Sequence, residues 1–148
     1  MRKIVLLTTL FVCQFVSALD FKVFGPCQDE PLLHEKVEYV LPVSVGQLTV
    51  DIFDKNEVPY IGATAYMQSI FNTPFGLDAM EVISDTYMRS HGWVFSVNGN
   101  VPDVYPHEVI VSNSDSVIWY YGYVVYDTGV WATEYLYTNT LKPEQFCQ

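Results

Sequence analysis

A β-strand followed by a tight turn is predicted by the stretch GWVFSVNG at residues 92–99. Its aromatic and β-branched residues favour extended backbone, and Asn98-Gly99 is a strong signal for a tight turn. Similar runs of β-forming residues, separated by turn-forming ones, lie on both sides of this stretch. They predict further strands at residues 43–53, 80–88, 108–111, 116–126 and 131–137.

One helix is expected among these strands, at residues 63–71. Apolar side chains recur there with the three- and four-residue spacing of a single helix face, and Pro74 prevents the helix from continuing. So short a helix is not stable alone in water, and it must therefore lie on a sheet. The sequence predicts an α+β fold, a small mixed or mostly antiparallel sheet with one short helix packed on it. The residues of the helix face are Ala63, Tyr66, Met67, Ile70 and Phe71.

Residues 1–18 are typical of a secretory signal peptide. Arg2 and Lys3 precede an apolar run, and residues 16–18 (Val-Ser-Ala) place small side chains where signal peptidase cleaves. The apolar run is shorter than the ~20 residues that a membrane-spanning helix needs. We expect cleavage after Ala18, with an uncleaved N-terminal anchor as the alternative. The mature protein is then expected to be secreted or periplasmic, without insertion into a membrane.

The remainder of the chain is expected to contain an N-terminal arm and one domain. Residues 19–42 are punctuated by prolines and show no sustained alternation, so we expect them to be irregular. Residues 43–148 are expected to form a single β-rich domain, because neither an internal repeat nor a low-complexity linker interrupts them.

Two cysteines remain once the signal peptide is removed. Cys27 and Cys147 lie near opposite ends of the mature chain, and in an oxidising compartment such a pair is expected to form a disulfide. The alternative is a metal site with two cysteine ligands. It is disfavoured because neither cysteine has a histidine or another cysteine at ligand spacing.

The charge of the chain restricts its partners. The formal net charge is −10, and loss of the basic residues of the signal peptide makes the mature chain more acidic still. Such a surface repels nucleic acid and anionic lipid, so neither is expected as a partner.

The titratable residues do not form a recognisable catalytic pattern. His34, His91 and His107 are far apart in sequence, and they match no zinc-protease or serine-hydrolase motif. A Ca²⁺ site formed by the carboxylates Asp51, Asp54 and Glu57 is an alternative, but their spacing is not that of an EF-hand, and turn formation explains them. A carboxylate-based hydrolase would need a paired arrangement that the sequence gives no reason to expect. The protein is therefore expected not to be an enzyme and to hold no metal or cofactor.

Aromatic residues are concentrated at the C-terminal end. Eight of them lie between Trp119 and Tyr137, and on a strand they would point to both faces of the sheet. Either they fill the core of a small β domain, or some form an exposed strip that binds a partner with large, rigid side chains. On the second interpretation the ligand-binding residues are Trp119, Tyr121, Tyr123 and Trp131.

The pieces GWVFSVNG (92–99) and NSDSVIWY (113–120) resemble the transcobalamin C-terminal-domain-like family, a domain of otherwise unknown function in many exported bacterial proteins. The resemblance covers residues 43–126 and implies a β-grasp-like fold, with the helix at 63–71 following the first hairpin. In the cobalamin carriers this domain caps the corrinoid against a large helical domain. The present chain has no room for such a domain, so neither cobalamin nor any ligand residue is carried over.

These features lead to two hypotheses of function. The first is a non-catalytic, exported binding or accessory module that uses its aromatic strip to bind a protein, a carbohydrate or a small apolar ligand. The second is a structural component of an envelope or extracellular assembly, which would offer the edge of its sheet for strand addition.

Overall fold

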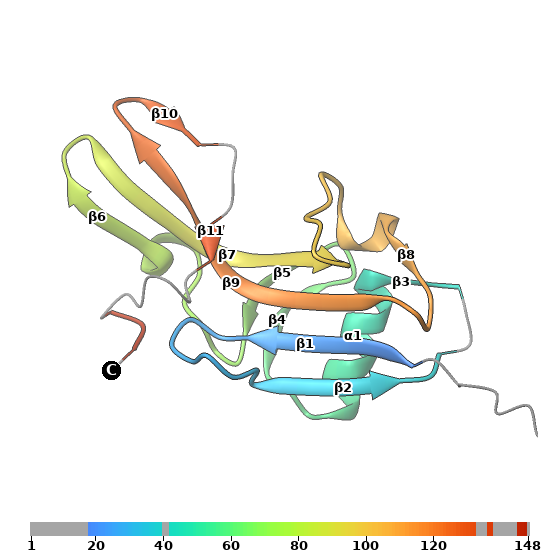
Figure 1. Cartoon of the computed structure of the whole chain (residues 1–148). Coiled ribbons are helices and arrows are strands. Elements are labelled where there is room, and N and C mark those ends of the chain that lie inside the picture. Colours follow the sequence, from blue (N-terminus) through green and yellow to red (C-terminus); the bar gives the residue numbers. More distant parts are fainter. Residues whose placement is uncertain (1–17, 40–41, 133–135, 138–144, 148) are drawn as a thin grey trace, which may run out of the picture.

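The computed structural model describes residues 18–39, 42–132, 136–137 and 145–147 (Figure 1). Nearly all of the predicted signal peptide, residues 1–17, lies outside this part, as does Tyr135 of the aromatic tail. The described chain is a curled mixed sheet with one α-helix, so the predicted α+β class is confirmed. None of the described helices has the length and apolar character that crossing a bilayer requires.

The main sheet has seven strands in the order β2-β1-β9-β7-β6, and β10 and β11 also pair with β9. The β1–β9 pair is parallel and the other pairs are antiparallel, with His91 opposite Tyr123 and Phe95 opposite Trp119 in the long β7–β9 ladder. The strands are β1 (Leu19–Phe24), β2 (Leu33–Val37), β6 (Met80–Ser84), β7 (Tyr87–Val97), β9 (Ser116–Asp127), β10 (Val130–Trp131) and β11 (Leu136–Tyr137).

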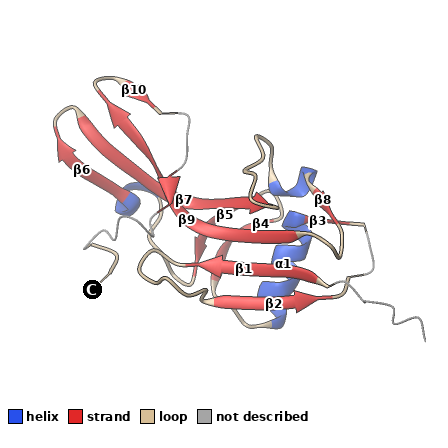
Figure 2. Ribbon diagram, in the orientation of Figure 1, coloured by secondary structure: helices blue, strands red, loops and turns tan. Residues whose placement is uncertain are grey.

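A second layer covers one face of this sheet (Figure 2). The helix packs its apolar side chains against β1 and β9, and a neighbouring hairpin contributes to the same core. Phe53 of the helix meets Phe21 of β1 edge to face, with ring centroids 6.0 Å apart. The elements of this layer and its connections are α1 (Val45–Lys55), β3 (Val43–Ser44), β4 (Tyr60–Ala63), β5 (Tyr66–Ile70), η1 (Gly76–Ala79), η2 (Pro106–Glu108) and β8 (Ile110–Val111).

The prediction of a strand at residues 43–53 was wrong, because most of this segment is α1. Its buried residues alternate in places, but they also recur at helical spacing, and the side chains that face the sheet are Val45, Leu48, Thr49, Ile52 and Phe53. Ser44 caps the helix, since its hydroxyl accepts a hydrogen bond from the Gln47 backbone N–H at 3.2 Å. A serine followed three residues later by glutamine is a helix-start signal that the alternation concealed.

The prediction of a helix at residues 63–71 was wrong as well, because this segment is the end of β4, a turn and β5. Within β5, Met67 and Ser69 are buried while Tyr66 and Gln68 are exposed, which is the period of a strand. The irregular register between Ile61 and Gly62 brings the hairpin to its turn. Over so few residues, the apolar positions satisfied both periods.

The segment 19–42 is not the irregular arm that its prolines predicted. It contains β1 and β2, and β1 lies between β2 and β9 inside the main sheet. Leu19, Phe21 and Val23 alternate with polar or half-exposed residues and are fully buried against α1. The prolines lie in the connections, so they mark the ends of strands rather than the absence of strands.

The strands predicted at 92–99 and 116–126 are confirmed, and Asn98-Gly99 forms the predicted turn with both residues at positive φ. The segment predicted as one strand at 80–88 is a hairpin, β6 and the start of β7, because Asp85 and Thr86 form a turn.

Part of the main sheet extends beyond the region that α1 covers (Figure 1). This part consists of β6, β10 and the adjoining ends of β7 and β9. We call these four pieces the arm.

The predicted disulfide is present. Cys27 follows β1, Cys147 lies at the C-terminal end, and their Cα atoms are 5.3 Å apart although 120 positions separate them in sequence. The bond therefore ties the end of the chain to the loop between β1 and β2.

Candidate functional site

The four aromatic residues predicted to bind a ligand do not form one exposed strip. Trp119 and Tyr121 are only 2% and 1% exposed. Tyr123 is half-buried, and Trp131 of the arm is 45% exposed and packs on Tyr126, 5.1 Å between ring centroids. The alternation along β9 turns Trp119 and Tyr121 toward the layer formed by α1, the β4–β5 hairpin and the loop after it. That layer covers them, so they form part of the interior of the domain.

A different set of residues forms a groove at the edge of this layer. It has a volume of about 310 Å³, at the lower end of the range of ~300–1,000 Å³ that is typical of ligand sites. Its floor is formed by core side chains of β5, β7 and β9, and its rim by the loop that follows Asn98-Gly99. The lining residues are Ala65, Tyr66, Met67, Trp93, Val94, Phe95, Val101, Pro102, Val104, Tyr105, Pro106 and Trp119.

The floor of the groove is apolar because its polar atoms bond inward. The indole N–H of Trp119 donates to Thr49 Oγ1 of α1 at 2.9 Å. The indole N–H of Trp93 donates to Thr73 Oγ1 at 2.7 Å. Both rings therefore offer carbon surface rather than a hydrogen-bond donor to whatever occupies the groove.

The rim exposes large side chains that would ordinarily be buried. Val101, Val104 and Tyr105 are about half exposed or more, and Tyr66 faces them from the turn of the β4–β5 hairpin. None of the described lining residues carries a charged side chain, although the chain as a whole has a net charge of −10. The groove is thus a neutral, apolar and aromatic surface on an acidic protein.

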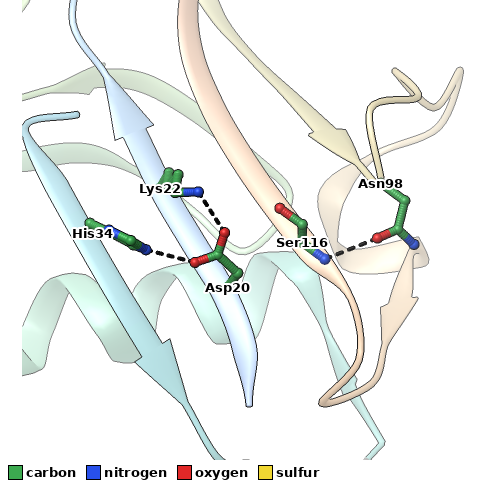
Figure 3. Close-up of polar contacts among 5 residues, drawn as sticks. All are labelled: Asp20, Lys22, His34, Asn98 and Ser116. Carbon is green, nitrogen blue, oxygen red and sulfur yellow. Dashed lines mark hydrogen bonds and ion pairs between the residues drawn. The ribbon is translucent and has the colours of Figure 1, made fainter. Parts of the chain in front are cut away.

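The rim loop is anchored at its base by a polar network, of which Figure 3 shows the bond between Asn98 and Ser116. The Asn98 side-chain oxygen accepts from the Ser116 backbone N–H at 3.0 Å, and its amide nitrogen donates to Asp115 at 2.8 Å. Asp115 also accepts from Ser112, and these hydrogen bonds hold the pKa of its carboxyl below the ordinary value. The two sequence pieces that carried the family resemblance, 92–99 and 113–120, are therefore joined to each other where β7 ends and β9 begins.

The three histidines lie on separate elements and none is paired with a nucleophile in the described structure. His34 of β2 bonds Asp20 at 2.6 Å on the surface, and Lys22 bonds the same carboxylate at 2.6 Å (Figure 3). These two bonds keep the pKa of the Asp20 carboxyl below its ordinary value, and the bond to Lys22 has the larger effect. His107 stacks on Tyr105 in η2, and His91 is buried in β7.

The carboxylates considered for calcium bond to neighbouring protein groups. Asp51 accepts from Gln47 and from the Tyr39 hydroxyl, and Asp54 accepts from the Tyr60 hydroxyl. Burial raises the pKa of the Asp51 carboxyl above its ordinary value, and the nearby charge of Asp54 raises it further. Within the part of the chain that the structure describes, no group of three or more His, Cys, Asp or Glu residues could hold a metal ion.

Sequence reasoning missed the groove because its parts are far apart in sequence. The available signal was the loop 101–106, in which two valines and a tyrosine lie between prolines without being in a strand. Apolar residues in a loop either join the core or face a ligand, and this loop was interpreted only as a connection.

Comparison with protein families identifies the greater part of this chain. Residues 44–123, more than half of its length, match a domain of unknown function, DUF4430. The chain belongs to the DUF4430 family. The DUF4430 segment begins at the cap of α1, ends within β9 and includes every residue that lines the groove. Cys27, Cys147 and Trp131 lie outside the DUF4430 segment.

Two further comparisons, with curated proteins and with solved structures, found no match. DUF4430 is a domain of unknown function, so the family gives no activity for this chain.

Proposed function

We propose that this protein is a non-catalytic, exported binding module that takes a small, uncharged, apolar ligand in the groove between β5, β7 and the loop 98–106. The observation that carries the proposal is the composition of the groove, in which exposed Val104 and Tyr105 face aromatic floor residues and no charged side chain is among the described lining. Burial of apolar area drives binding to such a surface without any fixed charge on the ligand.

The chemistry of the lining favours an apolar ligand over a carbohydrate or an ion. Sugars are held by many hydrogen bonds, yet the indoles of Trp93 and Trp119 donate into the protein, and tyrosine hydroxyls at the rim are the main polar side-chain groups left. A charged ligand would lose its hydration without gaining a partner, which is costly.

The sequence supports the exported part of the proposal. Residues 1–18 have the order of basic start, apolar run and small residues that is typical of a cleaved signal, and disulfides such as Cys27–Cys147 persist mainly in oxidising compartments. The resemblance to the transcobalamin C-terminal-domain-like family is compatible with a small module that contacts a ligand with one surface. The proposal does not extend to cobalamin, because a groove of about 310 Å³ buries too little of so large a ligand.

A charge placed at the rim should abolish binding. We expect the neutral fluorophore N-phenyl-1-naphthylamine to bind the wild-type protein saturably, with a change in tryptophan emission because Trp93 and Trp119 line the groove. Val104→Lys should weaken this binding at least about tenfold, because the lysine ammonium must be kept hydrated where the ligand would lie.

Val130→Lys is the matched control for that titration. Val130 is also an exposed valine, but it belongs to β10 in the arm and does not line the groove. The substitution should leave the affinity unchanged. Equal affinity of the wild-type protein and Val104→Lys, or no saturable binding at all, would contradict a ligand site in this groove.

A second candidate function, strand addition in a larger assembly, is favoured by the edge of the main sheet. β6 is the last strand of that sheet and has no further partner strand among those described. Val82 is 71% exposed and Ile83 is 49% exposed, and no lysine or proline protects the strand. Such an edge is suited to accept an extended strand of another chain.

Self-association tests this second candidate. If β6 pairs with another copy, the wild-type protein should sediment as a concentration-dependent dimer or larger species. Val82→Lys should make it monomeric, because an inserted lysine disfavours edge pairing. Ile110→Lys, which changes another exposed apolar side chain, in the separate β3–β8 pair, should leave the association unchanged. A wild-type monomer at all concentrations would count against strand addition between copies.

A further inference from the structure

A short C-terminal strap, residues 145–147, lies on the same face of the main sheet as the buried ring of His91. Phe146 packs on the His91 imidazole edge to face, with centroids 4.8 Å apart, and on the Tyr121 ring at 5.6 Å. Cys147 binds Cys27 covalently, and the Gln145 side chain donates to the Met80 carbonyl at 3.5 Å. The disulfide is therefore the strongest of the described links between the strap and the rest of the protein.

The strap covers a charged cluster at the base of the arm. The His91 side chain is fully buried, and its Nε2 lies 3.3 Å from Oε2 of Glu81 on β6. The Arg89 guanidinium bonds the same carboxylate oxygen at 3.0 Å and lies over the Tyr123 ring. The second imidazole nitrogen, Nδ1, has no hydrogen-bond partner among the described residues.

This environment keeps His91 uncharged. Burial is the largest cause that lowers the pKa of His91, and the positive charge of Arg89 lowers it further. The hydrogen bond and the negative charge of Glu81 act in the opposite direction. The other groups that face the ring, Tyr121, Tyr123 and Phe146, are neutral. None of the described residues accepts a hydrogen bond from Nδ1, so protonation of this nitrogen is disfavoured while Phe146 covers the ring.

We propose that the Cys27–Cys147 disulfide is a redox latch, which holds Phe146 over His91 and releases it when the bond is reduced. The reductant is a dithiol. The two sulfurs of the dithiol join as a disulfide, and two electrons and two protons pass to the Cys27–Cys147 bond. This S–S bond breaks, and Cys27 and Cys147 become thiols. The strap then separates from the sheet, and the His91–Glu81 pair becomes accessible to solvent.

The opening is local because the latch lies outside the main core. The cluster formed by α1, β1, β5, β7 and β9 contains neither Cys27 nor Phe146. Both cysteines also lie outside residues 44–123, which match the DUF4430 family. The inference does not depend on a ligand in the groove.

Chemical modification of the full-length mature protein tests the latch. Diethyl pyrocarbonate acylates neutral, accessible imidazoles, and mass spectrometry of peptides locates the modified histidines. In the oxidised protein at pH 7, exposed His34 and His107 should react while His91 is protected. After reduction by dithiothreitol, the reaction rate of His91 should rise at least about tenfold, because the Phe146 ring that packs on it is lost.

Two variants separate a latch from general unfolding. Phe146→Ala keeps the disulfide but removes the cover, so His91 should become reactive in the oxidised protein. Trp131→Ala, which changes an exposed aromatic side chain of the arm, should not have this effect. Cys147→Ser should make His91 reactive without any reductant. In each case far-ultraviolet circular dichroism should remain that of the wild-type protein.

Titration of His91 gives a second readout. The pKa of His91 should be higher in the reduced protein than in the oxidised protein, because loss of Phe146 lessens the burial that lowers it. Continued protection of His91 after reduction, or loss of the whole fold on reduction, would overturn the proposal.

Discussion

Replacement of Trp119 by alanine is expected to lower the free energy of unfolding by about 3–5 kcal/mol. The indole lies between the sheet and α1, is 2% exposed and packs on Phe95 with ring centroids 5.3 Å apart. Its N–H also donates to Thr49 across 70 positions of sequence. Alanine would leave a large cavity at the junction of helix and sheet, so urea denaturation followed by circular dichroism should show a much lower midpoint.

Trp131→Ala is the matched control for this experiment. Trp131 was predicted from sequence to share one exposed strip with Trp119, but it is 45% exposed in the arm. Its loss should change the free energy of unfolding by less than about 1 kcal/mol. Equal effects of the two substitutions would show that Trp119 is not a core residue and would return it to the list of surface contacts.

Gly46→Ala is expected to destabilise the protein by at least about 2 kcal/mol, although alanine is by about 1 kcal/mol the better helix former. Gly46 lies in the first turn of α1, against the turn between β4 and β5. A Cβ atom at this position would lie 1.8 Å from the carbonyl oxygen of Thr64 and 2.7 Å from its carbonyl carbon. Because these are backbone atoms, the helix or the hairpin must move.

The control for Gly46 is Gly92→Ala in the centre of β7. No atom lies within 4 Å of a Cβ built on Gly92, and its φ is not positive. Alanine should therefore be tolerated there, with a change in the free energy of unfolding within about 0.5 kcal/mol. Thermal and denaturant unfolding of both variants compares them, and a stable Gly46→Ala protein would mean that α1 does not approach the hairpin as closely as described.

The α+β class and the central ladder followed from local signals, but the place of the helix did not. Strong signals such as Asn98-Gly99 and the aromatic run of β9 report on their own backbone, and both predictions were confirmed. Residues 45–55 and 63–71 carry apolar positions that satisfy two periods at once. Packing decides between the two periods, because α1 packs against β1. The prolines in residues 19–42 had led to the prediction that this segment contains no strand.

The site was less predictable than the fold. The disulfide partners followed from counting cysteines, whereas the groove gathers side chains from β5, β7, β9 and a loop, which are far apart in sequence. The sequence identified Trp119 and Tyr121 as notable aromatics, yet an aromatic residue on a central strand serves the core unless the second layer leaves it uncovered. His91 matched no motif, and its burial under Phe146 could not be predicted because it depends on a bond between distant parts of the chain.

The parallel pairing of β1 with β9 sets the order in which this molecule can be completed. Asp20 is opposite Ser116 and Phe24 is opposite Tyr120. β1 therefore cannot pair with β9 until the chain has been synthesised nearly a hundred positions further. Contacts between such distant positions delay folding, since the intervening chain must be brought together before they form. A protein built in this way cannot complete its main sheet until β9 has been made, so β1 is left without its central partner strand until late in synthesis.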